Sequence, residues 1–267
     1  METGCRRAIL FLLFSPLFGT GFAQTETPVK VDKPLKSYSH WYFGAEYGVP
    51  FLFGDFTSFS ADKTYVGSQF GGFAGYQVNS WIGIEASART GYTRMGAKSY
   101  AGDYLMNADG MTYYTNQDFN TWKYKDVFSK VHFTNIGLQM NLNVNNFFGP
   151  NRGNRRWTVL LSPAVYAQHF STELINKADK SPLSGKKTDK WNIGIGGDVS
   201  LRYKISRAFD VQLRTGIIWV NNNKMDGIST LIKSKDHFMT SAGLSLIWKV
   251  GKKKEDNVLY ASRRAAD

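Results

Sequence analysis

Few side chains in this sequence have the types and spacing that catalysis requires. His169 and Ser171 are separated by one residue, and Glu173 follows two residues later. A histidine can activate a serine hydroxyl as a nucleophile when a carboxylate orients the imidazole. Glu173 is very close in sequence to serve as that carboxylate. A histidine at an interface beside a loop explains the pair equally well, and we predict no catalytic role for it.

The sequence contains no motif for a cofactor or a metal ion. Its one cysteine is Cys5, and the four histidines show no metal-ligand spacing: His40, His132, His169 and His237. Phosphate-loop and dinucleotide-binding motifs are absent. We therefore predict no cofactor, no metal site and no enzymatic activity.

Six charged residues share the polar faces of segments that are otherwise apolar. They comprise three acids and three arginines: Glu46, Glu85, Arg89, Asp198, Arg202 and Arg214. The guanidinium fork suits carboxylates at low dielectric. We predict a buried ion network that fills and stiffens an interior, with Glu85 and Arg202 as one example of a pair. The alternative is a gate, in which breaking the network opens a narrow path.

The element that positions these charges is clearest over residues 191–205. Trp191, Ile193, Ile195 and the following odd positions are almost all apolar, whereas the even positions are polar, charged or glycine. A period of two over such a length indicates a long β-strand. One apolar face and one polar face are typical of a strand with lipid outside and a polar lumen inside.

Seven further segments show the same alternation. The eight expected strands are 41–50, 70–78, 81–94, 131–145, 157–170, 191–205, 209–221 and 237–250. Pro163 lies within the fifth strand, where it removes a ladder hydrogen bond and predicts a bulge.

The connections between these strands alternate in length. Those over 51–69, 95–130, 171–190 and 222–236 are long, and the others are tight turns. Outer-membrane barrels have short periplasmic turns and long external loops. The loop over 95–130, rich in Tyr, Asn and Asp, is a candidate surface for an external ligand.

With that topology, the aromatic residues are expected in two belts at the membrane interfaces. The periplasmic belt comprises Trp41, Trp81, Trp157 and Trp248, and the outer belt comprises Tyr92, Trp191 and Trp219.

The N-terminus indicates export. Arg6 and Arg7 precede an apolar run, and small residues end at Ala23. This pattern predicts a signal peptide over 1–23, followed by a periplasmic lead-in over 24–40, a barrel over 41–250 and a polar periplasmic tail over 251–267. The net charge is +12. For an exported chain, we expect lipid headgroups and lipopolysaccharide phosphates as its counterparts, and no nucleic acid.

The last strand ends in a pattern that resembles the C-terminal signal of bacterial outer-membrane proteins. The residues are Ser241, Gly243, Leu246 and Trp248. With the signal peptide and the loop asymmetry, the chain resembles the small eight-stranded outer-membrane barrels, including the outer membrane protein A transmembrane domain and porin-family barrels. The resemblance covers residues 41–250. It implies an all-β, antiparallel, up-and-down transmembrane β-barrel in the outer membrane of a Gram-negative bacterium, folded by the barrel assembly machinery.

Fold alone does not fix function in this class. We expect a structural or surface-interaction role with a side-chain-filled lumen. His169 and Ser171 resemble the His-x-Ser pair of outer-membrane lipid A deacylases, so a lipid A-modifying enzyme is one alternative. An accessory barrel of a secretion or assembly machinery is another.

Overall fold

The computed structural model describes residues 38–107, 112–113, 121–148, 155–183, 187–221, 224–228, 237–251 and 256–261. The predicted signal peptide, residues 24–37 of the predicted lead-in, most of the turn after residue 148 and the lysines at 252–254 lie outside these residues.

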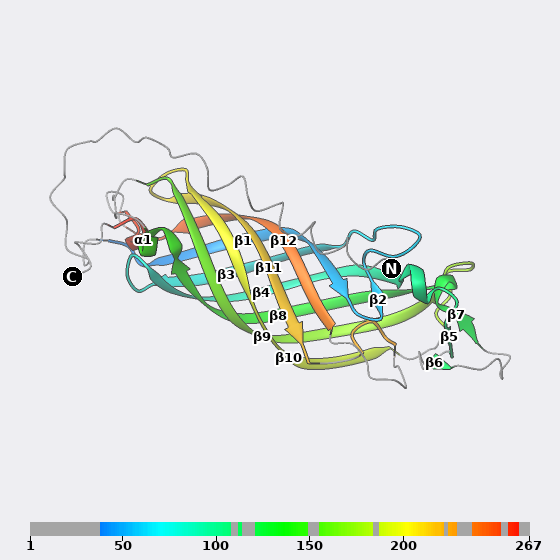
Figure 1. Ribbon diagram of the computed structural model, residues 1–267. Coiled ribbons are helices and arrows are strands. Elements are labelled where there is room, and N and C mark those ends of the chain that lie inside the picture. The colour runs from blue at the N-terminus through cyan, green and yellow to red at the C-terminus, as the bar shows by residue number, and fades with distance from the viewer. Residues whose placement is uncertain are drawn as a thin grey trace. The chain divides into compact units, whose positions relative to one another are not determined.

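Eight long strands form a closed antiparallel wall (Figure 1). They are β1 (Trp41–Phe53), β3 (Ser68–Gln77), β4 (Ile82–Ala97), β8 (Val127–Asn143), β9 (Trp157–Asn176), β10 (Thr188–Lys204), β11 (Phe209–Val220) and β12 (His237–Lys249). Each pairs with the next, and β12 pairs with β1 from Tyr42↔Lys249 to Phe53↔Phe238. This closure confirms the predicted eight-stranded up-and-down barrel and leaves the wall without a free edge.

The period-two pattern separates the two faces of the wall. Ile193 and Ile195 on β10 are 77% and 68% exposed, whereas Asp198 and Arg202 on the same strand are 2% and 1% exposed. Other exposed outward side chains include Ile84, Ile136, Leu138, Leu161, Val165, Leu213, Ile217, Leu244 and Leu246. A continuous apolar belt of this kind exceeds what a monomer in water exposes and suits contact with lipid.

Short elements occupy the connections. They are β2 (Phe56–Thr57), a small sheet of β5 (Leu105–Met106), β6 (Thr112–Tyr113) and β7 (Trp122–Lys123), the helix α1 (Val144–Phe148) and the 3₁₀ helices η3 (Ser99–Ala101), η4 (Tyr124–Asp126) and η5 (Val258–Tyr260). Within the described ranges, no helix is long and apolar enough to cross a membrane.

Six strands extend beyond their predicted bounds at the end of the barrel that carries the long connections, here called the long-loop end, and β8 and β9 extend the furthest. β8 begins at Val127 rather than 131, and β9 continues to Asn176 rather than 170. Inward residues of these extensions, Val127 on β8 and Leu174 on β9, pack in an apolar cluster. The strands therefore continue because their inner faces find apolar partners in the barrel mouth.

The predicted bulge at Pro163 is wrong. Pro163 pairs with Gly197 in an unbroken register with β10. On its other side, the ladder between β8 and β9 is interrupted after Gln139↔Ala164 and resumes in the same register at Leu142↔Leu161. Around the proline, β9 therefore loses backbone pairs with β8, but no extra residue is inserted into either strand, as a bulge would require.

An apolar core fills the interior near the long-loop end. Its residues come from strands and connections alike: Leu52, Phe56, Met95, Ala97, Ala101, Met106, Tyr124, Val127, Val131, Phe133, Phe170, Leu174, Met225, Ile228 and Met239. Met225 and Ile228 belong to the described part of the connection between β11 and β12, and both side chains are buried in this core. We call residues 224–228 the plug segment.

Candidate functional site

The six charged residues singled out in the sequence all point into the barrel and are buried. Their exposed fractions run from 0% at Glu85 to 6% at Glu46. They lie on β1, β4, β10 and β11, and each has the parity opposite to that of the lipid-facing residues of its strand. Their burial removes them from water, so their charges require partners inside the barrel.

Arg214 lies at the centre of this group. Its guanidinium contacts the carboxylates of Glu85 at 2.8 Å, Glu46 at 3.4 Å and Asp198 at 3.6 Å. Arg89 contacts two of the same acids, Asp198 at 2.9 Å and Glu46 at 3.2 Å. These two arginines and three acids thus form one connected ion network, which we call the lumen network.

Arg202 is brought close to this network without joining an ion pair. Its Nε donates to Gln212 Oε1 at 2.7 Å, and its guanidinium lies 4.8 Å from the ring centre of Tyr42. Within the described ranges it forms no salt bridge, and its Nη2 has no hydrogen-bond acceptor. The predicted example of a Glu85–Arg202 pair is therefore wrong, because the ion-pair partner of Glu85 is Arg214.

Neutral polar groups complete the coordination of Glu85. The Tyr42 hydroxyl donates to Oε2 at 2.9 Å, the Gln139 amide donates to Oε1 at 2.9 Å and the Asn141 amide donates to Oε2 at 3.1 Å. Sequence reasoning did not assign Tyr42 to the site. Because Tyr42 lies between the lipid-facing Trp41 and Phe43, the alternation of the strand could have placed it inside the barrel.

The end of the barrel with the short turns is closed by the C-terminal segment. Residues 256–261 pack against the barrel, with Val258, Leu259 and Tyr260 all buried. This differs from the predicted polar tail, because these apolar side chains cover the barrel mouth. The backbone of Ser39 pairs with this segment, donating to Asp256 O at 3.0 Å.

Tyr260 anchors this closure. Its hydroxyl donates to Asp210 Oδ2 at 2.8 Å, and the ammonium groups of Lys204 and Lys249 lie 4.7 and 4.8 Å from its ring centre. Burial, together with the nearby Asp210 carboxylate, raises the pKa of the Tyr260 phenol. Tyr260 therefore remains a neutral hydrogen-bond donor at physiological pH.

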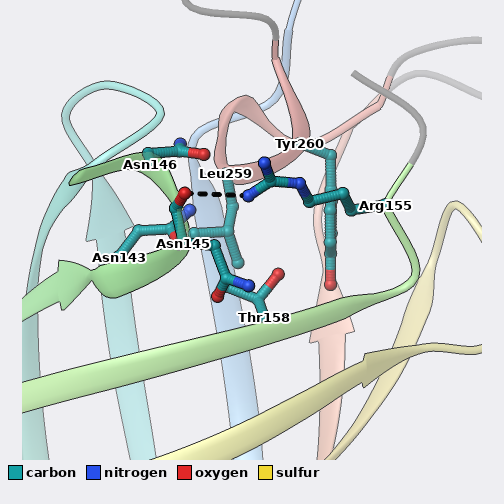
Figure 2. A pocket seen from close by; sticks show the side chains of 7 residues that line it. All are labelled: Asn143, Asn145, Asn146, Arg155, Thr158, Leu259 and Tyr260. Atoms are coloured by element: carbon teal, nitrogen blue, oxygen red, sulfur yellow. Dashed lines mark hydrogen bonds between the residues drawn. The ribbon is translucent and has the colours of Figure 1, made fainter. Parts of the chain in front are cut away.

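A small polar recess lies beside Tyr260 (Figure 2). It is lined by Asn143, Asn145, Asn146, Arg155, Thr158, Leu259 and Tyr260. Arg155 Nη1 donates to the carbonyl oxygen of Asn145 at 2.9 Å, so the one cation of the lining serves to hold the start of α1. The recess offers amides and hydroxyls but no carboxylate, imidazole or thiol for chemistry.

His169 contacts a carboxylate that the sequence did not indicate. Its Nε2 lies 2.5 Å from Asp189 Oδ1 on β10, and its ring lies 4.9 Å from that of Trp191. Ser171 is the cross-strand partner of Asp189, yet no hydrogen bond joins Ser171 to His169 in the described part of the chain. The arrangement is a surface His–Asp pair beside a serine and lacks the serine–histidine contact that nucleophilic activation needs.

The predicted girdle residues all lie on the outer surface. Their exposed fractions run from 41% at Trp81 to 60% at Trp191, and the set comprises Trp41, Trp81, Trp157, Trp248, Tyr92, Trp191 and Trp219. Several contact aromatic rings on neighbouring strands, as Trp157 does with Tyr203, with 4.5 Å between ring centres and an angle of 48° between the ring planes.

The residues of the predicted assembly signal divide between the two faces of β12. Leu246 and Trp248 are 54% and 52% exposed, whereas Ser241 and Gly243 lie on the inner parity. A Cβ on Gly243 would lie 3.3 Å from the Glu46 side chain. Gly243 thus makes room for the lumen network, and its recognition by the assembly machinery stays a prediction.

No protein-family model and no curated protein matches this sequence. Among solved structures, the chain is similar to Neisserial surface protein A, with 12% identity, coverage of 79% of this chain and 97% of that one, and a TM-score of 0.41. It is similar to Ail, the attachment invasion locus protein of Yersinia pestis, with 9% identity, coverage of 80% and 99%, and a TM-score of 0.41. It is also similar to a major outer membrane protein from Thermus thermophilus, with 12% identity, coverage of 79% and 99%, and a TM-score of 0.45. These are likenesses of fold, and the chain is by its own register an eight-stranded up-and-down β-barrel.

Proposed function

We propose that this chain is an outer-membrane barrel with a sealed interior and a structural or surface-interaction role. The lumen network carries this proposal. Arg214 and Arg89 bind Glu46, Glu85 and Asp198 across the barrel, so the side chains occupy the space that a channel would need. Eight strands leave an interior only wide enough for side chains to fill.

The outer surface supports a membrane setting for this role. The apolar belt and the exposed girdle aromatics match the surface that a lipid bilayer requires of a barrel. Lipid and lipopolysaccharide are the partners expected of that surface. The long connections are the parts of the chain available to a ligand in the external medium, which is the surface-interaction part of the proposal.

Conductance tests the sealed interior. The purified, folded barrel is inserted into planar bilayers, with a sixteen-stranded porin as the positive control and the heat-denatured chain as the negative control. We expect no steady porin-like conductance, because the lumen network spans the interior. A stable conductance comparable to that of the porin would overturn the proposal.

The contact between His169 and Asp189 favours a second candidate, a hydrolase acting on lipid A. A histidine oriented by a carboxylate supplies two of the three members of a serine–histidine–acid triad, and Ser171 on the same strand as His169 is the candidate for the third. The test measures fatty acid released from lipid A by the wild type, by Ser171→Ala and by a control, Ser206→Ala, in an exposed turn. Release that disappears only in Ser171→Ala would establish this candidate, and no release by the wild type would eliminate it.

A further inference from the structure

Three potential metal ligands meet at the long-loop end, away from the lumen network. Asp55 lies in the turn between β1 and β2, Asp226 lies in the plug segment, and His237 begins β12. The ligand atoms of the three side chains all lie within 4.8 Å of one another. Because they come from three separate segments, no spacing along the sequence could reveal them.

Asp226 is a fully buried carboxylate. It accepts hydrogen bonds from the backbone N–H groups of Phe56 at 2.9 Å and Ile228 at 3.0 Å. In the described part of the chain, no lysine or arginine forms a salt bridge with it, and the nearest basic group is the imidazole of His237. The two hydrogen bonds fix the orientation of the carboxylate, and its charge still calls for a cation, since buried charges are paired or coordinate metals.

His237 supplies the observation that points to a ligand. The ring is 0% exposed, and its Nε2 has no hydrogen-bond partner in the described part of the chain. Nε2 lies 3.7 Å from Asp226 Oδ2, too far for a hydrogen bond but compatible with two ligands of one ion.

Glycine at position 54 permits this approach. A Cβ built on Gly54 would lie 2.8 Å from both Asp226 Oδ2 and His237 Nε2. Any other residue would push the carboxylate and the imidazole away from the turn that carries Asp55. The bare backbone at this position keeps the three side chains together.

We propose that Asp55, Asp226 and His237 bind one divalent transition-metal ion of the Zn²⁺ class. Two carboxylates and one imidazole are a donor set that Zn²⁺ accepts, with a water molecule as a further ligand. Coordination through Nε2 places the imidazole proton on Nδ1. This costs the hydrogen bond from the Met225 N–H, which is long at 3.3 Å. In return, the ion neutralises two neighbouring carboxylates.

The bound ion fastens the plug segment into the barrel mouth. That segment is already tied to the wall, because Ser129 donates to the Asp226 carbonyl and Thr172 donates to the Met225 carbonyl at 2.7 Å. An ion bound by Asp226, His237 and Asp55 links the plug segment to two more parts of the wall, the start of β12 and the turn after β1. The ion then adds to the hydrogen bonds and the apolar packing that already hold the plug segment in the barrel mouth.

The test titrates Zn²⁺ into the chelator-treated, folded barrel in detergent and follows heat by calorimetry. We expect one saturable equivalent and a higher unfolding temperature with Zn²⁺ present. Asp226→Asn and His237→Gln each weaken binding by at least tenfold. The control pair, His169→Gln and Asp189→Asn, removes the exposed His–Asp contact and leaves affinity unchanged.

Two further measurements keep the test decisive if a buried variant fails to fold. Asp55→Asn, at a half-buried position in a turn, is expected to weaken Zn²⁺ binding by at least tenfold in a folded barrel. Co²⁺ bound to the wild type is expected to give visible absorption bands that Zn²⁺ abolishes by competition. No saturable Zn²⁺ site, or a site lost in His169→Gln and kept in Asp55→Asn, would overturn the proposal.

Discussion

At the scale of single residues, Arg214 holds more of the interior together than any of its neighbours in the lumen network. It contacts all three acids, whereas Arg89 contacts two. A buried ion pair adds little over an apolar pair of the same shape, but removing one member leaves the other charge stranded. The lumen network is therefore sensitive to single substitutions.

Arg214→Ala should lower the free energy of unfolding by roughly 3–5 kcal/mol, because Glu85 loses its ion-pair partner inside the barrel. The matched control is Arg207→Ala, which removes an arginine from an exposed turn. Urea titration of the folded barrel in lipid vesicles measures both. Equal stabilities of the two variants would mean that Arg214 is not a buried partner.

A double-mutant cycle tests the specific pair. Glu85→Gln together with Arg214→Gln should destabilise the barrel less than the sum of the single changes, by roughly 0.5–3 kcal/mol, because the second change no longer strands a charge. Glu85→Gln combined with Arg207→Gln should be additive. An additive Glu85/Arg214 cycle would contradict the 2.8 Å contact between them.

Parity along each strand was enough to place the six charges inside, but not to pair them. The partner of Glu85 on β4 lies on β11, across the interior, and is set by the register and tilt of a closed barrel. Comparing the number of residues between each charge and its strand end predicts Arg202 as the partner of Glu85. Arg202 is instead buried against Gln212 and Tyr42. His169 shows the same limit, since its partner Asp189 lies on the neighbouring strand.

At the scale of elements, glycines on the inner faces of the strands make room for the lumen network. A Cβ on Gly216 of β11 would lie 1.9 Å from Asp198 Oδ1. Gly216 pairs with Asp198 across the ladder, so the carboxylate leans over the bare backbone of its neighbour. The strand accepts the conformational cost of glycine because the interior is too narrow for another side chain.

Gly216→Ala should therefore destabilise the barrel by roughly 1–3 kcal/mol through overpacking. Gly72→Ala on β3 is the control, since its added Cβ would meet only the Gly44 carbonyl oxygen, at 3.5 Å. The free energy of unfolding in the same vesicles distinguishes them. A neutral Gly216→Ala would show that Asp198 does not occupy the space above this strand.

The strands themselves were well predicted, because alternation is a local signal and all eight appear within six residues of their expected bounds. What the sequence could not show depends on contacts between distant segments. β8 and β9 extend because the apolar core accepts Val127 and Leu174. Residues 256–261 fold back because Tyr260 finds Asp210 on β11.

At the scale of the whole barrel, the interior is closed at successive levels. Tyr260 and its neighbours cover the short-turn end, the lumen network fills the middle, and the apolar core with the plug segment fills the long-loop end. Each level uses a different interaction, so no single substitution is expected to open a continuous path. The outward apolar belt requires that this closed barrel lie in a membrane.

The orientation of the barrel in the membrane tests this view most directly. The only cysteine of the sequence is Cys5, within the predicted signal peptide, so a mature chain offers a clean background for introduced cysteines. Lys123→Cys lies at the long-loop end, and Arg207→Cys lies in the turn between β10 and β11; both positions are exposed. The measurement is labelling of intact cells with a maleimide too large to cross the outer membrane.

We predict that Lys123→Cys is labelled in intact cells and that Arg207→Cys is labelled only after the outer membrane is permeabilised. Labelling of Arg207→Cys in intact cells, or equal labelling of both positions, would contradict a barrel that spans the outer membrane with its long connections outside.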